Sequence, residues 1–199
     1  MEPLESQVPF PVRFVHDAEC AAELELWRDP ELTDAIYLSL GEHLGGAIVS
    51  DGKIQRGRTG TFEYMTLEEG GRKCYCGKLG CVECYCSADA LLREGESLES
   101  FFQLLRKDDL GYCRRWGMYL DWMAAALNNI HMVMDSVIVL GGHIAPYLTR
   151  EDLARLFMAI QARTAFPESE NFLRLGVQEQ DAVAIGAAIP FVRSFLASI

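Results

Sequence analysis

Hydrophobic residues recur along the chain at two spacings, which predict helices in some segments and strands in others. Between residues 112 and 134, large apolar residues lie three or four positions apart, which indicates a long helix with one buried face. That face carries Trp116, Tyr119, Leu120, Met123, Leu127, Ile130 and Met134. The same spacing predicts a helix over residues 98–106. Core packing accounts for these aromatic and methionine side chains without a cofactor.

Five short runs rich in β-branched, aromatic or leucine residues predict strands. They are residues 12–15, 35–40, 45–50, 136–140 and 172–177. The second and third runs are separated by four residues and form a hairpin, which ends at an Asp51-Gly52 turn. The fourth run is apolar throughout, as in a fully buried strand, and it leads into Gly141-Gly142. A diglycine lets a ligand or a helix approach the backbone closely.

Polar residues at helix starts divide the remaining chain. Asp17 is placed to cap a helix that follows the strand at residues 12–15, and a further helix is expected over residues 88–94. Thr149 is expected to cap a helix over residues 150–163, and Asp181 opens the closing helix. Repeats, low-complexity segments and interdomain linkers are not evident after residue 11. We therefore expect residues 1–11 to lead into a single domain over residues 12–199.

Five of the seven cysteines lie within one short stretch, which predicts a metal site. The C-x-C-x4-C spacing of Cys74, Cys76 and Cys81 can turn three thiolates toward one zinc ion. Gly77 and Gly80 stand where a tight loop needs a positive φ. The alternative is a set of reduced thiols without metal. Disulfides are less favoured, because the cysteine count is odd and the chain does not start with a secretory signal.

Composition limits the class of protein. The chain has 199 residues, half of them hydrophobic, and no segment approaches the ~20 uninterrupted apolar residues of a membrane span. The net charge of −11 argues against direct contact with nucleic acid, which requires a clustered basic surface. We expect a soluble, cytoplasmic protein with no membrane partner.

The cysteine-rich stretch also resembles the signature of the ROK family of sugar kinases and sugar-responsive repressors. The matching residues are Cys74, Cys76, Gly77, Gly80, Cys81, Glu83 and Ser87. The resemblance implies an α/β fold, one lobe of the actin-like ATPase (ribonuclease H-like) type. Such a lobe has a mixed β-sheet, packed helices and an inserted zinc knuckle, here residues 74–86. In the family, three cysteines and a histidine hold a structural zinc ion beside the sugar pocket.

Four other segments match the family in the same order and imply roles for their residues. Asp17 matches the catalytic base that takes the proton from the sugar hydroxyl, and His16 replaces the sugar-binding asparagine beside it. Glu83 matches a glutamate that contacts the sugar. The fourth segment, residues 181–188, matches the family's closing helix, and the two other segments carry glycines at positions that border the bound nucleotide. They are Gly41 and Gly45, near the phosphates, and Gly141 and Gly142, near the adenine.

Several family residues are replaced. Glu42 stands for a phosphate-binding threonine and His43 for a glycine, so a carboxylate and a side chain oppose the approach of phosphate. With the usual spacing, Thr61 stands for a sugar-binding glutamate and Tyr64 for the zinc-binding histidine. Shifting the register restores a glutamate, Glu63, but no histidine.

The fourth zinc ligand must therefore come from elsewhere. Cys84 is preferred to Cys86, because it lies three residues after Cys81 and the two thiols would share a helix face. Alternatively, both additional cysteines are small buried hydrophobic residues.

The resemblance covers only the C-terminal half of a ROK protein, and the functional hypotheses follow from this. We expect a degenerate, non-catalytic lobe that binds a sugar or serves as a regulatory subunit, with structural zinc and without ATP or magnesium. The alternative is a sugar kinase lobe that a separately encoded N-terminal lobe completes. A structural remnant without a ligand is the third hypothesis. The partner expected for the non-catalytic lobe is a second copy of the chain or that separate N-terminal lobe.

Overall fold

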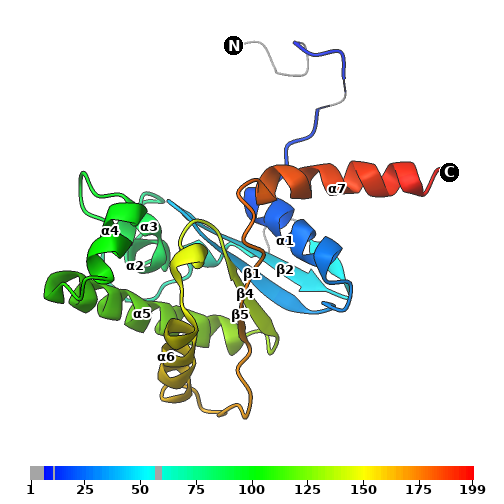
Figure 1. The fold of residues 1–199 in the computed structure, drawn as a ribbon. Helices are drawn as coiled ribbons and strands as arrows, with labels where there is room; N and C mark the ends of the chain where they lie inside the picture. Colours follow the sequence, from blue (N-terminus) through cyan, green and yellow to red (C-terminus); the bar gives the residue numbers. More distant parts are fainter. Residues whose placement is uncertain (1–6, 11, 57–59) are drawn as a thin grey trace.

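The computed structural model describes residues 7–10, 12–56 and 60–199. The segment predicted to lead into the domain, residues 1–11, therefore lies largely outside the described residues. Within the described chain, five strands form one sheet, and helices pack on both of its faces (Figure 1). No helix in the described residues is long and apolar enough to cross a membrane.

The sheet is mixed, in the order β3-β2-β1-β4-β5. Its strands are β1 (Ala35–Leu40), β2 (Leu44–Ser50), β3 (Lys53–Gln55), β4 (Val137–Gly141) and β5 (Leu173–Leu175). The first three form an antiparallel meander, and β4 and β5 are added in parallel beside β1. This is the arrangement expected of the lobe, and the predicted fold class is confirmed.

The helices form layers on the two faces of the sheet (Figure 1). On one side α1 (Asp17–Arg28) covers β1 and β2, and α7 (Ala182–Leu196) packs on α1. On the other side lie α5 (Leu110–His131) and α6 (Arg150–Gln161), which pack against each other. The short helices of this side are α2 (Glu83–Cys86), α3 (Ala88–Leu91) and α4 (Leu98–Leu105), and the 3-10 turns are η2 (Phe62–Tyr64) and η3 (Ala145–Tyr147).

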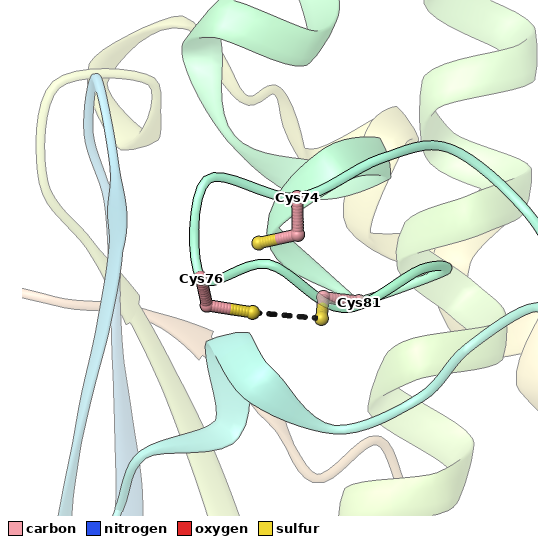
Figure 2. Close-up of side chains that lie close together, drawn as sticks. All are labelled: Cys74, Cys76 and Cys81. Carbon is pink, nitrogen blue, oxygen red and sulfur yellow. Dashed lines mark hydrogen bonds between the residues drawn. The ribbon is translucent and has the colours of Figure 1, made fainter.

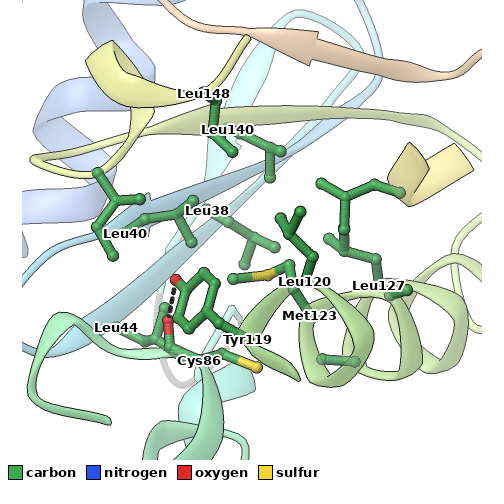
Figure 3. Packing of buried hydrophobic residues seen from close by; sticks show 14 of the residues in the cluster. Leu38, Leu40, Leu44, Cys86, Tyr119, Leu120, Met123, Leu127, Leu140 and Leu148 are labelled. Carbon is green, nitrogen blue, oxygen red and sulfur yellow. Dashed lines mark hydrogen bonds between the residues drawn. The ribbon is translucent and has the colours of Figure 1, made fainter. Parts of the chain in front are cut away.

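Alternating residues of β1 supply the two hydrophobic cores. Leu38 and Leu40 point to the larger core, where α5 contributes Tyr119, Leu120 and other residues (Figure 3). Tyr37 points to the opposite core beneath α1, as the two-residue period of a strand requires. The Tyr119 hydroxyl donates a 2.6 Å hydrogen bond to the Cys86 carbonyl oxygen, and this bond ties α2 to the core.

Most predicted elements are confirmed to within a few residues. The long helix is α5, the hairpin is β1–β2, and Thr149 caps α6 in a reciprocal pair with Asp152. The prediction of a strand over residues 12–15 is wrong. These residues join no strand of the described sheet, and the Phe14 side chain is 80% exposed.

Three boundaries also differ from the prediction. Asp17 is the first residue of α1 rather than its cap, because His16 takes the extended conformation before the helix. The helix expected over residues 88–94 ends at Leu91, since Leu92 is already extended. The sequence did not predict β3, which follows the turn at Asp51 and Gly52, both with positive φ.

Candidate functional site

The cysteine-rich loop folds back on itself between η2 and α2. Backbone contacts pair Thr66 with Cys81 and Lys73 with Leu79. Gly77 and Gly80 have φ of +88° and +75°, which confirms the prediction that this loop needs glycine. At Gly80 a side chain is also excluded by space, because a Cβ atom there would lie 1.6 Å from the Glu68 carbonyl oxygen.

This folding brings the three thiols of the C-x-C-x4-C pattern together (Figure 2). The Sγ atoms of Cys74, Cys76 and Cys81 all lie within 4.8 Å of one another. The Sγ atoms of Cys76 and Cys81 are 3.6 Å apart, which is far too long for a disulfide. Cys74 and Cys81 are buried, and Cys76 is exposed.

The donor set and its spacing fit zinc. In a tetrahedral site with zinc–sulfur bonds of about 2.3 Å, sulfur atoms are separated by about 3.8 Å. The observed separation of 3.6 Å between Cys76 and Cys81 is close to this value. Burial, together with hydrogen bonds to the other two thiols, raises the pKa of Cys81 to about 12. The Lys78 backbone N–H lowers the pKa of Cys76. Only a cation between the sulfurs would favour three thiolates at once.

The fourth ligand is less well placed. Cys84, on α2, is not among the thiols that lie within 4.8 Å of one another. Its pKa is raised to about 11, first by burial and then by neighbouring Cys74, so it borders the cluster. Tyr64, at the family's histidine position, hydrogen bonds instead through its hydroxyl to the Tyr75 hydroxyl, 3.2 Å away. Cys86 is fully buried, in agreement with a hydrophobic role.

Glu83, at the start of α2, links the cysteine loop to the β1–β2 loop. Its carboxylate is buried, and both oxygens are occupied. Oε1 lies 2.8 Å from His43 Nδ1, and Oε2 accepts a 2.8 Å hydrogen bond from the Leu44 backbone N–H. The hydrogen bond to Glu83 raises the pKa of His43. The glutamate predicted to contact a sugar is thus held by the residue that replaces the family's glycine.

Asp17 and His16 lie beside the β2 backbone at the start of α1. His16 Nδ1 and Asp17 Oδ1 are 3.4 Å apart, and the Asp17 side chain is 71% exposed. A Cβ atom on Gly45 would lie 3.6 Å from Asp17 Oδ1 and 3.7 Å from His16 Cε1. Gly45 therefore keeps β2 close to this pair without a side chain in between. The Asp17 carboxylate is exposed to solvent, and its Oδ1 accepts a 2.8 Å hydrogen bond from the Ala18 N–H.

Glu63, in η2, is a buried carboxylate that faces the same region. Burial raises its pKa, the charge of His16 lowers it, and the charges of Glu83 and Asp17 raise it. Its Oε2 is buried without a hydrogen-bond partner among the described residues. Thr61, which stands at the family's glutamate position, is exposed. The structure thus supplies a carboxylate two residues after the expected position.

The remaining predicted glycines make close backbone contacts within the protein. A Cβ atom on Gly141 would lie 2.0 Å from the Tyr37 hydroxyl oxygen, and one on Gly142 would lie 2.6 Å from the Leu40 backbone nitrogen. The carbonyl oxygen of Gly41 accepts a 2.8 Å hydrogen bond from the Ala88 N–H at the start of α3. The close contacts explain Gly141 and Gly142 without a nucleotide, and the predicted role of all three glycines stays untested.

Two features of the site were missed from the sequence. The His43–Glu83 pair joins residues 40 positions apart, which no local pattern reveals. The burial of Glu63 could have been suspected, because a register shift placed a glutamate near the family's position. The described residues therefore bring His16, Asp17, His43, Glu63 and Glu83 to one region, beside the cysteine cluster.

Comparison with protein-family models gives one match, to the model described as the ROK family, over residues 1–193. Among characterised relatives, the chain is 29% identical to N-acetylmannosamine kinase from Vibrio cholerae serotype O1 over 202 aligned residues. The alignment covers 94% of this chain and 68% of that kinase. The chain thus spans about two thirds of the length of this relative.

Solved structures show the same fold. A ROK family glucokinase from Streptomyces griseus, in complex with glucose and AMPPNP, superposes with a TM-score of 0.83 at 23% identity. That match covers 94% of this chain and 70% of the glucokinase. A ROK family transcriptional regulator, a homologue of the E. coli MLC protein, gives a TM-score of 0.75 at 20% identity, over 94% of this chain and 54% of the regulator. Both a kinase and a regulator thus contain this lobe.

Proposed function

Because the chain belongs to the ROK family, we propose that it is a sugar-binding or regulatory lobe that does not itself transfer phosphate. The observation that carries this proposal is the pairing of His43 with Glu83. His43 stands where the family's phosphate loop has a glycine, and its ring is held by Glu83 and lies against Tyr75. The β1–β2 loop is therefore assigned to the sugar-binding part of the site, through its contacts with Glu83.

The charge of the β1–β2 loop supports the same proposal. Glu42 is exposed beside His43, and its carboxylate repels the phosphates of a nucleotide. The backbone N–H of Leu44 is already bound to Glu83, so it is not free to bind a phosphate oxygen. Phosphoryl transfer depends on positioned donors and cations around the transferred group. In this loop the Leu44 N–H and the His43 ring are both engaged by Glu83, and we do not expect ATP with magnesium to bind.

Sugar binding is supported by the residues that remain. Asp17 and Glu83 match positions that contact sugar in the family, and His16 and Glu63 add polar groups to the same region. The relatives include an N-acetylmannosamine kinase and a glucokinase solved with glucose. A hexose or N-acetylated hexosamine is therefore the ligand class that we propose.

Zinc is proposed as a structural ion of the cysteine loop. Cys74, Cys76 and Cys81 would hold it, and Cys84 would reach it only after a small movement. The ion would neutralise the crowded thiolates and fix the start of α2. Since α2 carries Glu83, the metal would act on the sugar site by positioning.

The second candidate function is a sugar kinase lobe that a separate N-terminal lobe completes. It is favoured by Asp17, whose carboxylate is retained and exposed. The face of α7 also leaves Phe191 and Phe195 more than 60% exposed, as an unpartnered interface would. A second copy of the chain is the alternative partner for this face.

Ligand binding and phosphate transfer test the two candidates. Calorimetry with N-acetylmannosamine, N-acetylglucosamine, glucose and ATP with magnesium is expected to show binding of at least one sugar and none of ATP. Asp17→Asn should weaken sugar binding about tenfold or more, whereas Glu94→Gln, an exposed control, should not change it. Phosphorylated sugar formed by the chain alone would contradict the proposal. Product formed only after addition of an N-terminal lobe would favour the second candidate, and no ligand at all would favour a structural remnant.

A further inference from the structure

A second group of potential metal ligands lies outside the cysteine loop, where α5 ends. His131 is the last residue of α5, Asp135 follows in the turn before β4, and Glu168 lies between α6 and β5. One ligand atom from each lies within 4.8 Å of the other two. His131 Nε2 is 3.7 Å from Asp135 Oδ1 and 3.7 Å from Glu168 Oε1. Two separate parts of the sequence, residues 131–135 and Glu168, thus present one imidazole and two carboxylates to the same point.

The imidazole of His131 is buried without a hydrogen bond. The residue is 9% exposed, and neither ring nitrogen has a hydrogen-bond partner among the described residues. Distances of 3.7 Å to the carboxylates are too long for hydrogen bonds. A buried polar group without a partner is costly, by about 1–3 kcal/mol. A ligand bound between the His131 ring and the two carboxylates would give the ring nitrogen the partner that it lacks.

The surroundings hold two of the three groups in position. The His131 ring stacks on Phe172, with centroids 3.6 Å apart and planes tilted by 6°. Glu168 is fixed through its backbone, because its N–H donates to Gln161 Oε1 at 3.0 Å and its carbonyl accepts from Gln161 Nε2. The Asp135 side chain is 91% exposed and free to rotate. His131 and Glu168 are therefore held in place, and the Asp135 carboxylate can adjust its position to meet them.

We propose that His131, Asp135 and Glu168 bind a divalent cation of the class that accepts nitrogen and oxygen ligands, such as Mn²⁺ or Zn²⁺. Bonds of about 2.1 Å to each ligand atom require separations of about 3.0–3.4 Å between ligand atoms. The observed 3.7 Å needs only a small closure, which the exposed Asp135 side chain allows. Water would complete the coordination on the open side.

Such a cation would add a direct link between the end of α5 and the chain between α6 and β5, beside the existing packing of α5 on α6. It would fix the end of α5 to the segment that leads into β5. It differs in chemistry from the cysteine cluster, which offers sulfur only. Manganese discriminates between the two sites, because it prefers oxygen and nitrogen ligands to thiolates.

The test uses the full chain with its cysteine site already loaded with zinc. Titration with Mn²⁺, followed by electron paramagnetic resonance, is expected to show one bound ion per chain. Asp135→Asn and Glu168→Gln should each weaken its binding about tenfold or more, and the double variant should abolish it. Asp121→Asn is the control, since Asp121 is an exposed acid on the same helix, α5. Unchanged binding in the double variant, or no bound Mn²⁺ in the unaltered chain, would overturn the proposal.

A second measurement observes His131 directly. Its ring nitrogens are followed by nitrogen NMR as Zn²⁺ is added to the chain already loaded at the cysteines. A change in the Nε2 resonance that Asp135→Asn and Glu168→Gln together suppress is expected. A ring that stays protonated on both nitrogens throughout the titration would show a simple ion pair and refute the site. This readout does not depend on a His131 variant that could fail to fold.

Discussion

The cysteine-rich loop and the β1–β2 loop lie side by side but have changed to different degrees. The first keeps the family's cysteines, both of its glycines and Glu83, and its backbone is closed by short-range pairs. The second keeps Gly41 and Gly45 but carries Glu42 and His43 between them. Glu83 connects the two, since it binds His43 and the Leu44 N–H.

This difference shows how a binding site can be altered without loss of the fold. The cysteine loop is constrained by space, because Gly80 has no room for a side chain and three thiols meet at one point. The β1–β2 loop is exposed at Glu42 and His43, so substitutions there cost little stability. The histidine at position 43 is bound to Glu83 of the cysteine-rich loop. The sterically constrained residues and the replaced residues thus lie in different, neighbouring loops.

The largest expected effect is on the cysteine loop. Cys74→Ser should remove one equivalent of zinc and lower the free energy of unfolding by about 4 kcal/mol or more. For a domain of this size the melting temperature would fall by roughly 8–16 °C. Metal analysis and calorimetry check both. Cys113→Ser, at a half-buried cysteine outside the cluster, is the control. Full zinc content in Cys74→Ser would contradict a thiolate site.

Two glycines of the same loop separate backbone strain from steric exclusion. Gly80→Ala should cost about 3 kcal/mol, since the new Cβ meets the Glu68 carbonyl oxygen and φ is positive. Gly77→Ala, where nothing lies within 4 Å, should cost about 1 kcal/mol from φ alone. Urea unfolding of the two variants measures the difference. Equal costs would mean that the loop around Gly80 can move.

The link between the loops is tested at Glu83. Glu83→Gln removes a buried charge that accepts two hydrogen bonds, and we expect a loss of about 1.5–3 kcal/mol. The exposed control Glu94→Gln should change the stability by less than about 0.5 kcal/mol. If Glu83→Gln and the control are equally stable in urea, the two loops are not coupled through this carboxylate.

The smallest effect is a dependence on pH at the same link. The pKa of His43 is raised by its bond to Glu83, so the folded state binds the proton more tightly than the unfolded state. The extra stability is fully present below the unfolded histidine pKa of about 6.5 and disappears as pH rises through the higher folded pKa. Comparison of the unaltered chain with His43→Gln between pH 5.5 and 8.5 should show a difference that shrinks as pH rises. A constant difference would exclude the ion pair.

Local sequence patterns predicted the fold well where burial leaves a regular spacing or an unbroken apolar run. The three- and four-residue spacing of Trp116, Tyr119 and Met123 fixes α5, and the apolar run before Gly141 fixes β4. Residues 12–15 show the limit, because they have strand composition but pair with no strand of the described sheet. Strand formation depends on a partner that local composition does not supply.

The site was only partly predictable for a related reason. The spacing of Cys74, Cys76 and Cys81 is local, so their convergence follows from the loop itself. The partners of Glu83 and the burial of Glu63 depend on how η2 and the β1–β2 loop meet, which involves distant residues. His131 is the clearest case: in sequence it is one more residue of a helix, and only the fold places Glu168 beside it.

The packing of α7 on α1 has a consequence for how the chain folds during synthesis. Glu25 on α1 accepts from the Val177 N–H, 152 residues away, and Glu23 pairs with Arg193, 170 residues away. A ribosome adding about 5–20 residues per second would therefore expose α1, with two carboxylates unpaired, for about 10–30 seconds before these partners emerge. During that interval α1 would offer an uncovered surface to chaperones, and the final step of folding would be the docking of α7.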